Sequence, residues 1–117
     1  LIKISPDMSE EDLKNLSTSV LVNNLDGIIC SNTTTHHNHH SGEGGLSGKP
    51  LLESSTRTLE TLRGLLGKDL PIIASGGVMD LESYRMKIDK GANLVQIYTG
   101  FIYEGPSLVD EIINSIS

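Results

Sequence analysis

Two successive segments near the end of the chain constrain its fold more than any other feature. Residues 71–78 read PIIASGGV and residues 93–100 read NLVQIYTG, so each is a short apolar run that ends in small or polar residues. A strand that ends in Gly-Gly exposes backbone N–H groups with no Cβ in the way, and a following helix N-terminus adds its positive dipole end. Each segment therefore predicts a strand end that can hold an anion such as phosphate.

The rest of the chain repeats this alternation of strand and helix. Four short apolar runs predict strands, and apolar residues at helical spacing follow each of them. Such alternation favours a parallel sheet with right-handed crossovers, which places all four strand ends at one edge. The predicted strands are residues 1–4, 27–30, 72–74 and 94–97, and helices are expected to begin at Ser9, at Ser54 or Ser55, at Asp80 and after Pro106.

The length of the chain decides how much of a fold it can supply. A complete (β/α)8 barrel needs about 250 residues, and this chain has 117. We therefore predict an α/β fold that is the C-terminal half of a (β/α)8 TIM barrel, with residues 1–117 as one part of a catalytic domain whose N-terminal half is missing. Phosphate in such barrels sits on the loops after strands seven and eight, which would be the last two strands here. An open, doubly wound four-stranded sheet is the competing architecture.

A half-barrel has consequences for its surface. The first and last strands would present unpaired edges, so we expect both to pair with strands outside this chain. The inner sheet face would also be uncovered, exposing Ile28, Ile73, Val95 or their neighbours.

Composition excludes several classes of protein. The formal net charge is −6, from nine Lys and Arg against fifteen Asp and Glu, which argues against nucleic-acid binding because basic groups supply most of that affinity. No run of about 18 apolar residues predicts a membrane span. One cysteine, Cys30, rules out an internal disulfide. Because it lies in an apolar strand, we interpret it as a core residue rather than a nucleophile.

Four histidines fall in one long segment, residues 34–49, which we predict to be loop. Histidines two to four positions apart can bind transition metals, but a loop without nearby cysteines or acids is poorly preorganised for a metal. We therefore expect no native metal site. The residues concerned are His36, His37, His39 and His40.

The strand ends bring chemically useful side chains to one edge. Lys3 is either a strand-end lysine that reaches water or a cation that stabilises an anion formed in a reaction. Asn32 either caps a turn or offers hydrogen bonds to the amide edge of a heterocycle. A side chain at Gly77 is expected to crowd a phosphate held at the third strand end.

Five blocks in order resemble one known family over nearly the whole chain. Residues 3–7 (KISPD), 31–34 (SNTT), 44–51 (GGLSGKPL), 72–77 (IIASGG) and 94–99 (LVQIYT) are similar to the C-terminal half of class 2 dihydroorotate dehydrogenases. These are quinone-linked flavoenzymes of pyrimidine synthesis. The Asn-Thr-Thr and Gly-Leu-Ser-Gly-Lys-Pro-Leu forms favour class 2 over class 1. The chain departs from the family pattern at Ser5, at residues 35–43 and at residues 79–81.

The resemblance implies an FMN cofactor and specific contacts to it. Gly77, Tyr98 and Thr99 would hold the FMN phosphate, mainly through backbone N–H groups, and Gly48 would approach the phosphate from the preceding loop. Lys3 would lie at the pyrimidine edge of the flavin.

The resemblance also assigns the residues that follow the second strand. Ser31 would help to position the flavin, while Asn32 and Thr33 would bind the polar edge of dihydroorotate or orotate. No catalytic residue is expected in this chain, because the family's general base is a serine upstream of Leu1.

Further expectations follow from the same resemblance. The N-terminal region would supply the quinone tunnel and peripheral contact with the inner or cytoplasmic membrane, so this chain alone should be inactive. Two other readings stay open from the residues alone. One is a different flavin- or phosphate-binding barrel enzyme, and the other is a non-enzymatic half-barrel that binds a phosphoryl ligand.

Overall fold

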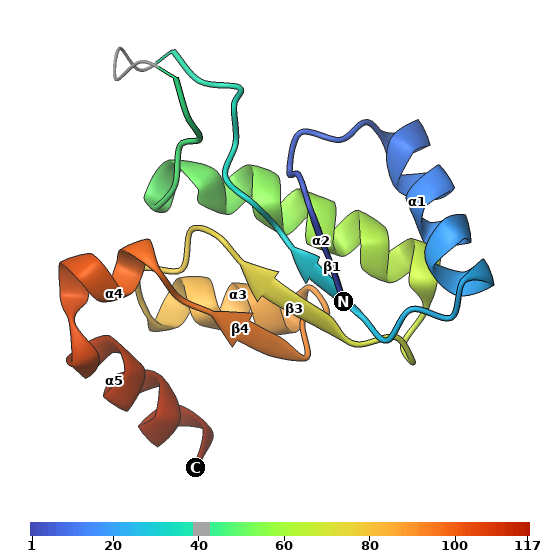
Figure 1. Cartoon of the computed structure of the whole chain (residues 1–117). Helices are drawn as coiled ribbons and strands as arrows, with labels where there is room; N and C mark the ends of the chain where they lie inside the picture. The colour runs from blue at the N-terminus through green and yellow to red at the C-terminus, as the bar shows by residue number, and fades with distance from the viewer. Residues whose placement is uncertain (39–42) are drawn as a thin grey trace.

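A four-stranded parallel sheet forms the centre of the computed structural model, which describes residues 1–38 and 43–117 (Figure 1). The strands run in the order β1-β2-β3-β4, and each pairs in parallel with the next. A doubly wound sheet reverses its strand order at a switch point, whereas this order never reverses. The described chain is therefore half of a (β/α)8 barrel, as predicted. The strands are β1 (Ile2–Ile4), β2 (Ile28–Cys30), β3 (Ile72–Ser75) and β4 (Leu94–Gln96).

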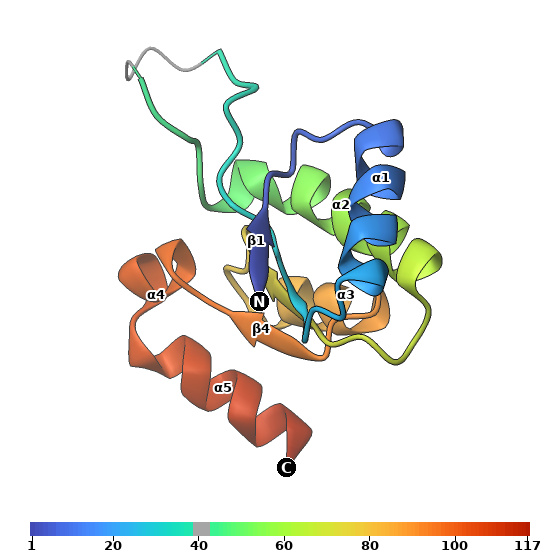
Figure 2. The same ribbon diagram turned by 45° about the vertical axis from the view of Figure 1, so that its right-hand side comes forward.

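The helices lie along one side of this sheet. α1, α2 and α3 cover the sheet on the same side (Figure 2), and α5 contacts both α3 and α4. A short helix, α4, follows β4 directly and was not predicted from the sequence. The helical elements are α1 (Glu10–Val22), the 3-10 turn η1 (Lys49–Leu51), α2 (Leu52–Leu66), α3 (Leu81–Asp89), α4 (Thr99–Glu104) and α5 (Pro106–Ile116).

The strand register separates a buried sheet face from an open one. Ile28 pairs with Ile72 and is fully buried under the helices, and Val95 pairs with the buried Ala74 and packs against the core. The sequence analysis expected Ile28, Ile73, Val95 or their neighbours on the uncovered face; this was wrong for Ile28 and Val95 themselves and right for Ile73. Alternate strand residues point to opposite faces, and the next residue along β2 belongs to the open face. A single cross-strand row on that face contains Lys3, Ile29, Ile73 and Leu94.

The hydrophobic core lies between the sheet and helices α1 and α2. Side chains from the covered sheet face pack against one apolar stripe from each helix. Burying a Leu, Ile or Val side chain contributes about 1.5–3 kcal/mol, so this layer holds the half-barrel together. The core residues are Ile4, Leu13, Val20, Ile28, Cys30, Leu59, Leu62, Leu66, Ile72, Ala74 and Ala92.

Two of the helix starts predicted from the sequence are confirmed, and a third is wrong. Ser9 and Asp80 cap α1 and α3, each with a reciprocal capping box. The start of α2 was wrong: it begins at Leu52, directly after η1, so Ser54 and Ser55 lie inside the helix. Pro50 favours an early helical start, and both serine hydroxyls donate to carbonyl oxygens instead of accepting from N–H groups.

Arg63 ties the C-terminal end of α2 to the loops that precede β3 and β4. Its guanidinium donates to the backbone carbonyls of Gly91, Gly67 and Leu70 and to the side chain of Asn93. Asn93 Oδ1 in turn accepts from the N–H of Ile72, at 2.9 Å. Arg63 thus fixes the end of the sheet opposite the strand exits.

None of the helices in residues 1–38 and 43–117 is both long enough and apolar enough to cross a bilayer.

Candidate functional site

The C-terminal ends of the four strands surround one cavity of about 120 Å³. Every residue that the sequence assigned to cofactor or substrate lies at its wall, although these residues are spread over 97 positions of the chain. The cavity is also lined by Ser47, Ser75 and Gln96, which the sequence analysis did not assign. The predicted residues at the wall are Lys3, Ser31, Asn32, Thr33, Gly48, Gly77, Tyr98 and Thr99.

Lys3 reaches this cavity from the open face of the sheet. It pairs in register with Ile29 and is exposed, while the flanking Ile4 is buried. The ammonium therefore stands on the side of the sheet that no helix of the described chain covers. A cation at this place can stabilise negative charge on a group bound in the cavity.

The turn after β2 is held by hydrogen bonds to the neighbouring strand β1 and among its own residues. Asn32 N–H donates to the carbonyl of Ile4 at 2.7 Å, and Thr33 N–H donates to Asn32 Oδ1 at 3.0 Å. Ser31 Oγ donates to the carbonyl of Asn32. The Asn32 side-chain oxygen thus accepts from the residue that directly follows it, and Asn32 also lines the cavity. Neither of the two interpretations of Asn32 is decided by these contacts.

The loop after β3 lies directly against the start of α2. Gly76 has φ +111° and Gly77 has φ +82°, a region that favours glycine. A Cβ at Gly77 would lie 2.3 Å from Leu52 Cα. The nearest obstacle to a side chain at Gly77 within the described chain is therefore the backbone of α2, a contact that the sequence analysis did not include. That a side chain here would also crowd a phosphate stays a prediction.

Residues 47–48 pack against the end of β4, although about 50 positions separate them in sequence. The hydroxyls of Ser47 and Thr99 are 2.8 Å apart. A Cβ at Gly48, which has φ +75°, would lie 3.1 Å from Thr99 Cγ2. Gly48 thus permits a close approach of this loop to Thr99, and both residues reach the cavity.

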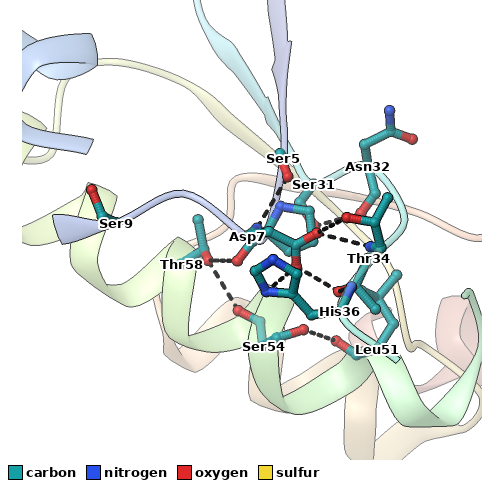
Figure 3. A network of polar contacts seen from close by, with 12 residues as sticks. Ser5, Asp7, Ser9, Ser31, Asn32, Thr34, His36, Leu51, Ser54 and Thr58 are labelled. Carbon is teal, nitrogen blue, oxygen red and sulfur yellow. Dashed lines mark hydrogen bonds and ion pairs between the residues drawn. The ribbon is translucent and has the colours of Figure 1, made fainter. Parts of the chain in front are cut away.

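Asp7 joins the loop after β1 to the segment after β2 (Figure 3). Its carboxylate accepts hydrogen bonds from Thr34 Oγ1, from Thr35 Oγ1 and from Thr35 N–H at 2.8 Å. Burial alone would raise the pKa of Asp7, but these hydrogen bonds outweigh it and hold the pKa below its usual value. The sequence analysis assigned no role to Asp7; the structure shows that it anchors the segment beginning at Thr34.

The histidine segment offers no metal centre among the residues that the structure describes. No group of three His, Cys, Asp or Glu side chains is placed to bind a metal within residues 1–38 and 43–117. His36 Nδ1 lies 3.7 Å from an Asp7 oxygen, and His37 Nε2 lies 3.1 Å from the carbonyl of Gly44. His39 and His40 lie outside the described residues. Thr34 and Leu46 form an antiparallel bridge within the segment predicted to be loop.

Cys30 is a core residue, as expected. It is fully buried, and desolvation raises the pKa of its thiol to about 12. A thiol that stays protonated is a poor nucleophile.

A larger hollow of about 600 Å³ lies beside the first cavity, next to α3 and α5. Among the described residues, its wall has one cation, Lys49, and four carboxylates, which are those of Asp80, Glu82, Glu104 and Glu111. Carboxylates repel phosphate and carboxylate ligands, so the smaller cavity with its lysine and glycine turns is the better candidate for an anionic ligand.

Comparison with known proteins identifies the family. The family model described as dihydroorotate dehydrogenase matches residues 1–117. The chain belongs to the dihydroorotate dehydrogenase family. Curated relatives named dihydroorotate dehydrogenase (quinone) include one from Pseudoalteromonas translucida, 43% identical, and one from Marinobacter nauticus, 46% identical. These alignments cover 99% and 98% of this chain and 36% of each relative.

A solved structure shares the fold of this dihydroorotate dehydrogenase family member. The crystal structure of the Eimeria tenella enzyme in complex with ferulenol superposes with a TM-score of 0.89 at 33% identity, and covers 99% of this chain and 34% of that one. The chain thus spans about a third of the length of the proteins it matches. The curated names support the quinone-linked class that the sequence blocks indicated.

Proposed function

We propose that this chain is the FMN- and substrate-binding half of an enzyme that oxidises dihydroorotate to orotate in pyrimidine synthesis and passes the electrons to a quinone. The observation that carries this proposal is the convergence of eight predicted contact residues on one cavity at the strand ends. Membership of the family supplies the reaction.

The cavity fits the phosphate group of FMN. Gly77 presents its backbone without a side chain, and Tyr98 and Thr99 follow β4 at the same wall. Backbone N–H groups at such turns bind anions. Gly48 and Ser47 close this end of the cavity through their contacts with Thr99. We assign the phosphate to Gly77, Tyr98 and Thr99, with Gly48 beside it.

Lys3 and Ser31 are assigned to the flavin ring. FMN, when bound, would supply the redox chemistry as the acceptor of a hydride, which is two electrons with one proton. Lys3 would hold its ammonium at the pyrimidine edge of the ring and stabilise negative charge there, because a fixed cation in a cavity needs little reorganisation. Ser31 orients the ring beside it.

Asn32 and Thr33 are assigned to the substrate. Their amide and hydroxyl groups match the carbonyl, N–H and carboxylate groups around dihydroorotate. Their work is positioning, since neither is a suitable base at neutral pH. The proton is removed by a serine that, by resemblance, lies upstream of Leu1.

The two edges of the sheet support the proposal of a complementary half-barrel. Leu1 and Leu94 are 67% and 63% exposed, and β1 and β4 each pair on one side only in the described chain. We propose that a second set of four strands pairs with both edges. The same complementary region would form the quinone site and the peripheral contact with the inner or cytoplasmic membrane.

The visible absorbance of the flavin provides the test. The complete barrel, meaning these 117 residues together with the complementary half, should be purified and titrated with dihydroorotate without oxygen. We expect a yellow protein whose flavin absorbance falls on adding dihydroorotate and returns on adding a quinone. A yellow protein that only other reductants bleach would refute the substrate assignment, and a colourless protein would refute the FMN assignment.

A further inference from the structure

Lys87 is a lysine with no access to solvent, in a helix whose neighbouring charged residues are exposed. It lies on α3 with an exposed fraction of 0%. The residues that α3 buries are Ser83 and Lys87, while Ile88 on the same helix is exposed. An ionised side chain is costly to bury without partners, so its contacts indicate what it does.

The ammonium of Lys87 is directed at Ser55 on α2. Lys87 Nζ lies 2.5 Å from Ser55 Oγ. A lysine ammonium can only donate, so Ser55 Oγ accepts and its own hydrogen is left for a carbonyl. The nearest acceptor is the carbonyl of Gly76 at 3.0 Å, with that of Leu52 at 3.2 Å.

These contacts connect a buried charge to the loop assigned to the phosphate. Gly76 and Gly77 both have positive φ and pack on Leu51 and Leu52. The carbonyl of Gly76 accepts a hydrogen bond from Ser55 of α2, and both Gly76 and Gly77 line the cavity. The Gly76 carbonyl and the Gly77 N–H belong to one planar trans peptide unit and point in opposite directions. The hydrogen bond that holds this carbonyl toward Ser55 therefore also fixes the direction of the Gly77 N–H.

Burial lowers the pKa of Lys87 to about 8, and the nearby Cys30 acts in the opposite direction. The ammonium is thus still the major form at neutral pH.

We propose that Lys87 is a positioning residue for the flavin phosphate: through Ser55 it holds the Gly76 carbonyl, and so sets the Gly77 turn against the phosphate. The inference rests on the proposed FMN site. It assigns a cofactor-selecting role to a side chain that does not touch the cofactor. The positive charge behind the loop favours a dianionic ligand over a neutral one in the same place.

The test compares FMN with riboflavin, which has the same ring and lacks the phosphate. Both are titrated by fluorescence into the apo form of the complete barrel carrying Lys87→Met, Ser55→Ala or both. Lys90→Met is the matched control, because Lys90 ends the same helix but is exposed and paired with Glu60.

We expect Lys87→Met to weaken FMN binding by about tenfold or more. Riboflavin binding should change by no more than about twofold. Ser55→Ala should also weaken FMN binding more than riboflavin binding. The double variant should bind FMN about as weakly as either single variant, because both substitutions break the same chain of contacts. The Lys90→Met control should bind both ligands as the parent does.

If Lys87→Met weakened the binding of FMN and riboflavin equally, or weakened neither, the role of Lys87 would be refuted. The proposed FMN site would not be affected by that result. If Lys87→Met does not fold, Ser55→Ala decides, since it removes a single oxygen from the same contact. A parent protein that binds neither flavin would refute the proposed function, and this inference with it.

Discussion

Gly77→Ala is the perturbation whose consequence the structure defines most sharply. Gly77 has φ +82°, and a Cβ there would lie 2.3 Å from Leu52 Cα, 2.5 Å from Leu52 N and 2.6 Å from Leu52 Cβ. Two of these three atoms are backbone atoms at the start of α2, so a rotamer change cannot relieve the overlap. The loop after β3 must move away from α2 and toward the cavity.

Two terms determine the size of the effect. A non-glycine residue in the left-handed region costs about 1–2 kcal/mol. Overpacking against fixed atoms costs about 1–3 kcal/mol more. We therefore expect Gly77→Ala to lower the free energy of unfolding by about 2–5 kcal/mol, and to weaken FMN binding because the displaced loop holds its phosphate.

The chain supplies two matched glycine controls. Gly67 has φ +73°, but within the described chain no non-neighbouring atom lies within 4 Å of its added Cβ. Gly67 combines this φ with ψ −157°, a conformation that almost only glycine adopts, so Gly67→Ala should lose the backbone term alone, about 1–3 kcal/mol. Gly64 lies within α2 with equally open space and ordinary φ, so Gly64→Ala should stabilise by about 1 kcal/mol.

Guanidinium denaturation of the complete barrel, with FMN titration of each variant, provides the assay. The expected order of stability is Gly64→Ala, parent, Gly67→Ala, then Gly77→Ala. If Gly77→Ala were as stable as Gly67→Ala, the packing of this loop on α2 would be wrong. If it lost stability but kept FMN affinity, the phosphate would lie elsewhere.

Three further predictions concern other parts of the chain. Lys3→Ala should slow flavin reduction by dihydroorotate by about 100-fold or more in stopped-flow absorbance, and near-parent rates would make Lys3 an ordinary surface lysine. Cys30, with its pKa raised from 9.0 to about 12, should hold about a thousandfold less thiolate at pH 8 than a thiol of pKa 9; rapid alkylation of the folded protein by iodoacetamide would contradict its burial. Asp7→Asn should lower stability by about 1–3 kcal/mol at pH 7. Because the folded pKa of Asp7 is lowered, this difference should persist above the unfolded pKa of about 4 and disappear as the pH falls through the folded value. An unchanged difference at low pH would exclude the carboxylate as its cause.

The parallel sheet and the strand ends were predictable because local patterns specify them. Short apolar runs ending in Gly-Gly or Tyr-Thr-Gly need no distant partner to be recognised. The capping box at Ser9 is similarly local, since residues three positions apart satisfy each other. The eight contact residues converge because parallel strand ends share one edge.

The missed features depend on contacts between distant segments. Lys87 faces inward because Ser55, 32 positions earlier, accepts its hydrogen bond, and periodicity assigns such a position to an apolar residue. The identity of the open sheet face was misassigned at Ile28 because a one-residue change in register exchanges the two faces. Gly77 packs on Leu52 because the fold brings the loop after β3 against the start of α2, and no local sequence pattern shows that contact.

A crystal structure of the complete barrel with FMN and orotate tests the central claim most directly. The account predicts that the flavin phosphate lies within hydrogen-bonding distance of the backbone N–H groups of Gly77 and Thr99, with Lys3 at the pyrimidine edge of the ring and Asn32 on orotate. A phosphate bound beyond this cavity, or orotate away from Asn32, would contradict it.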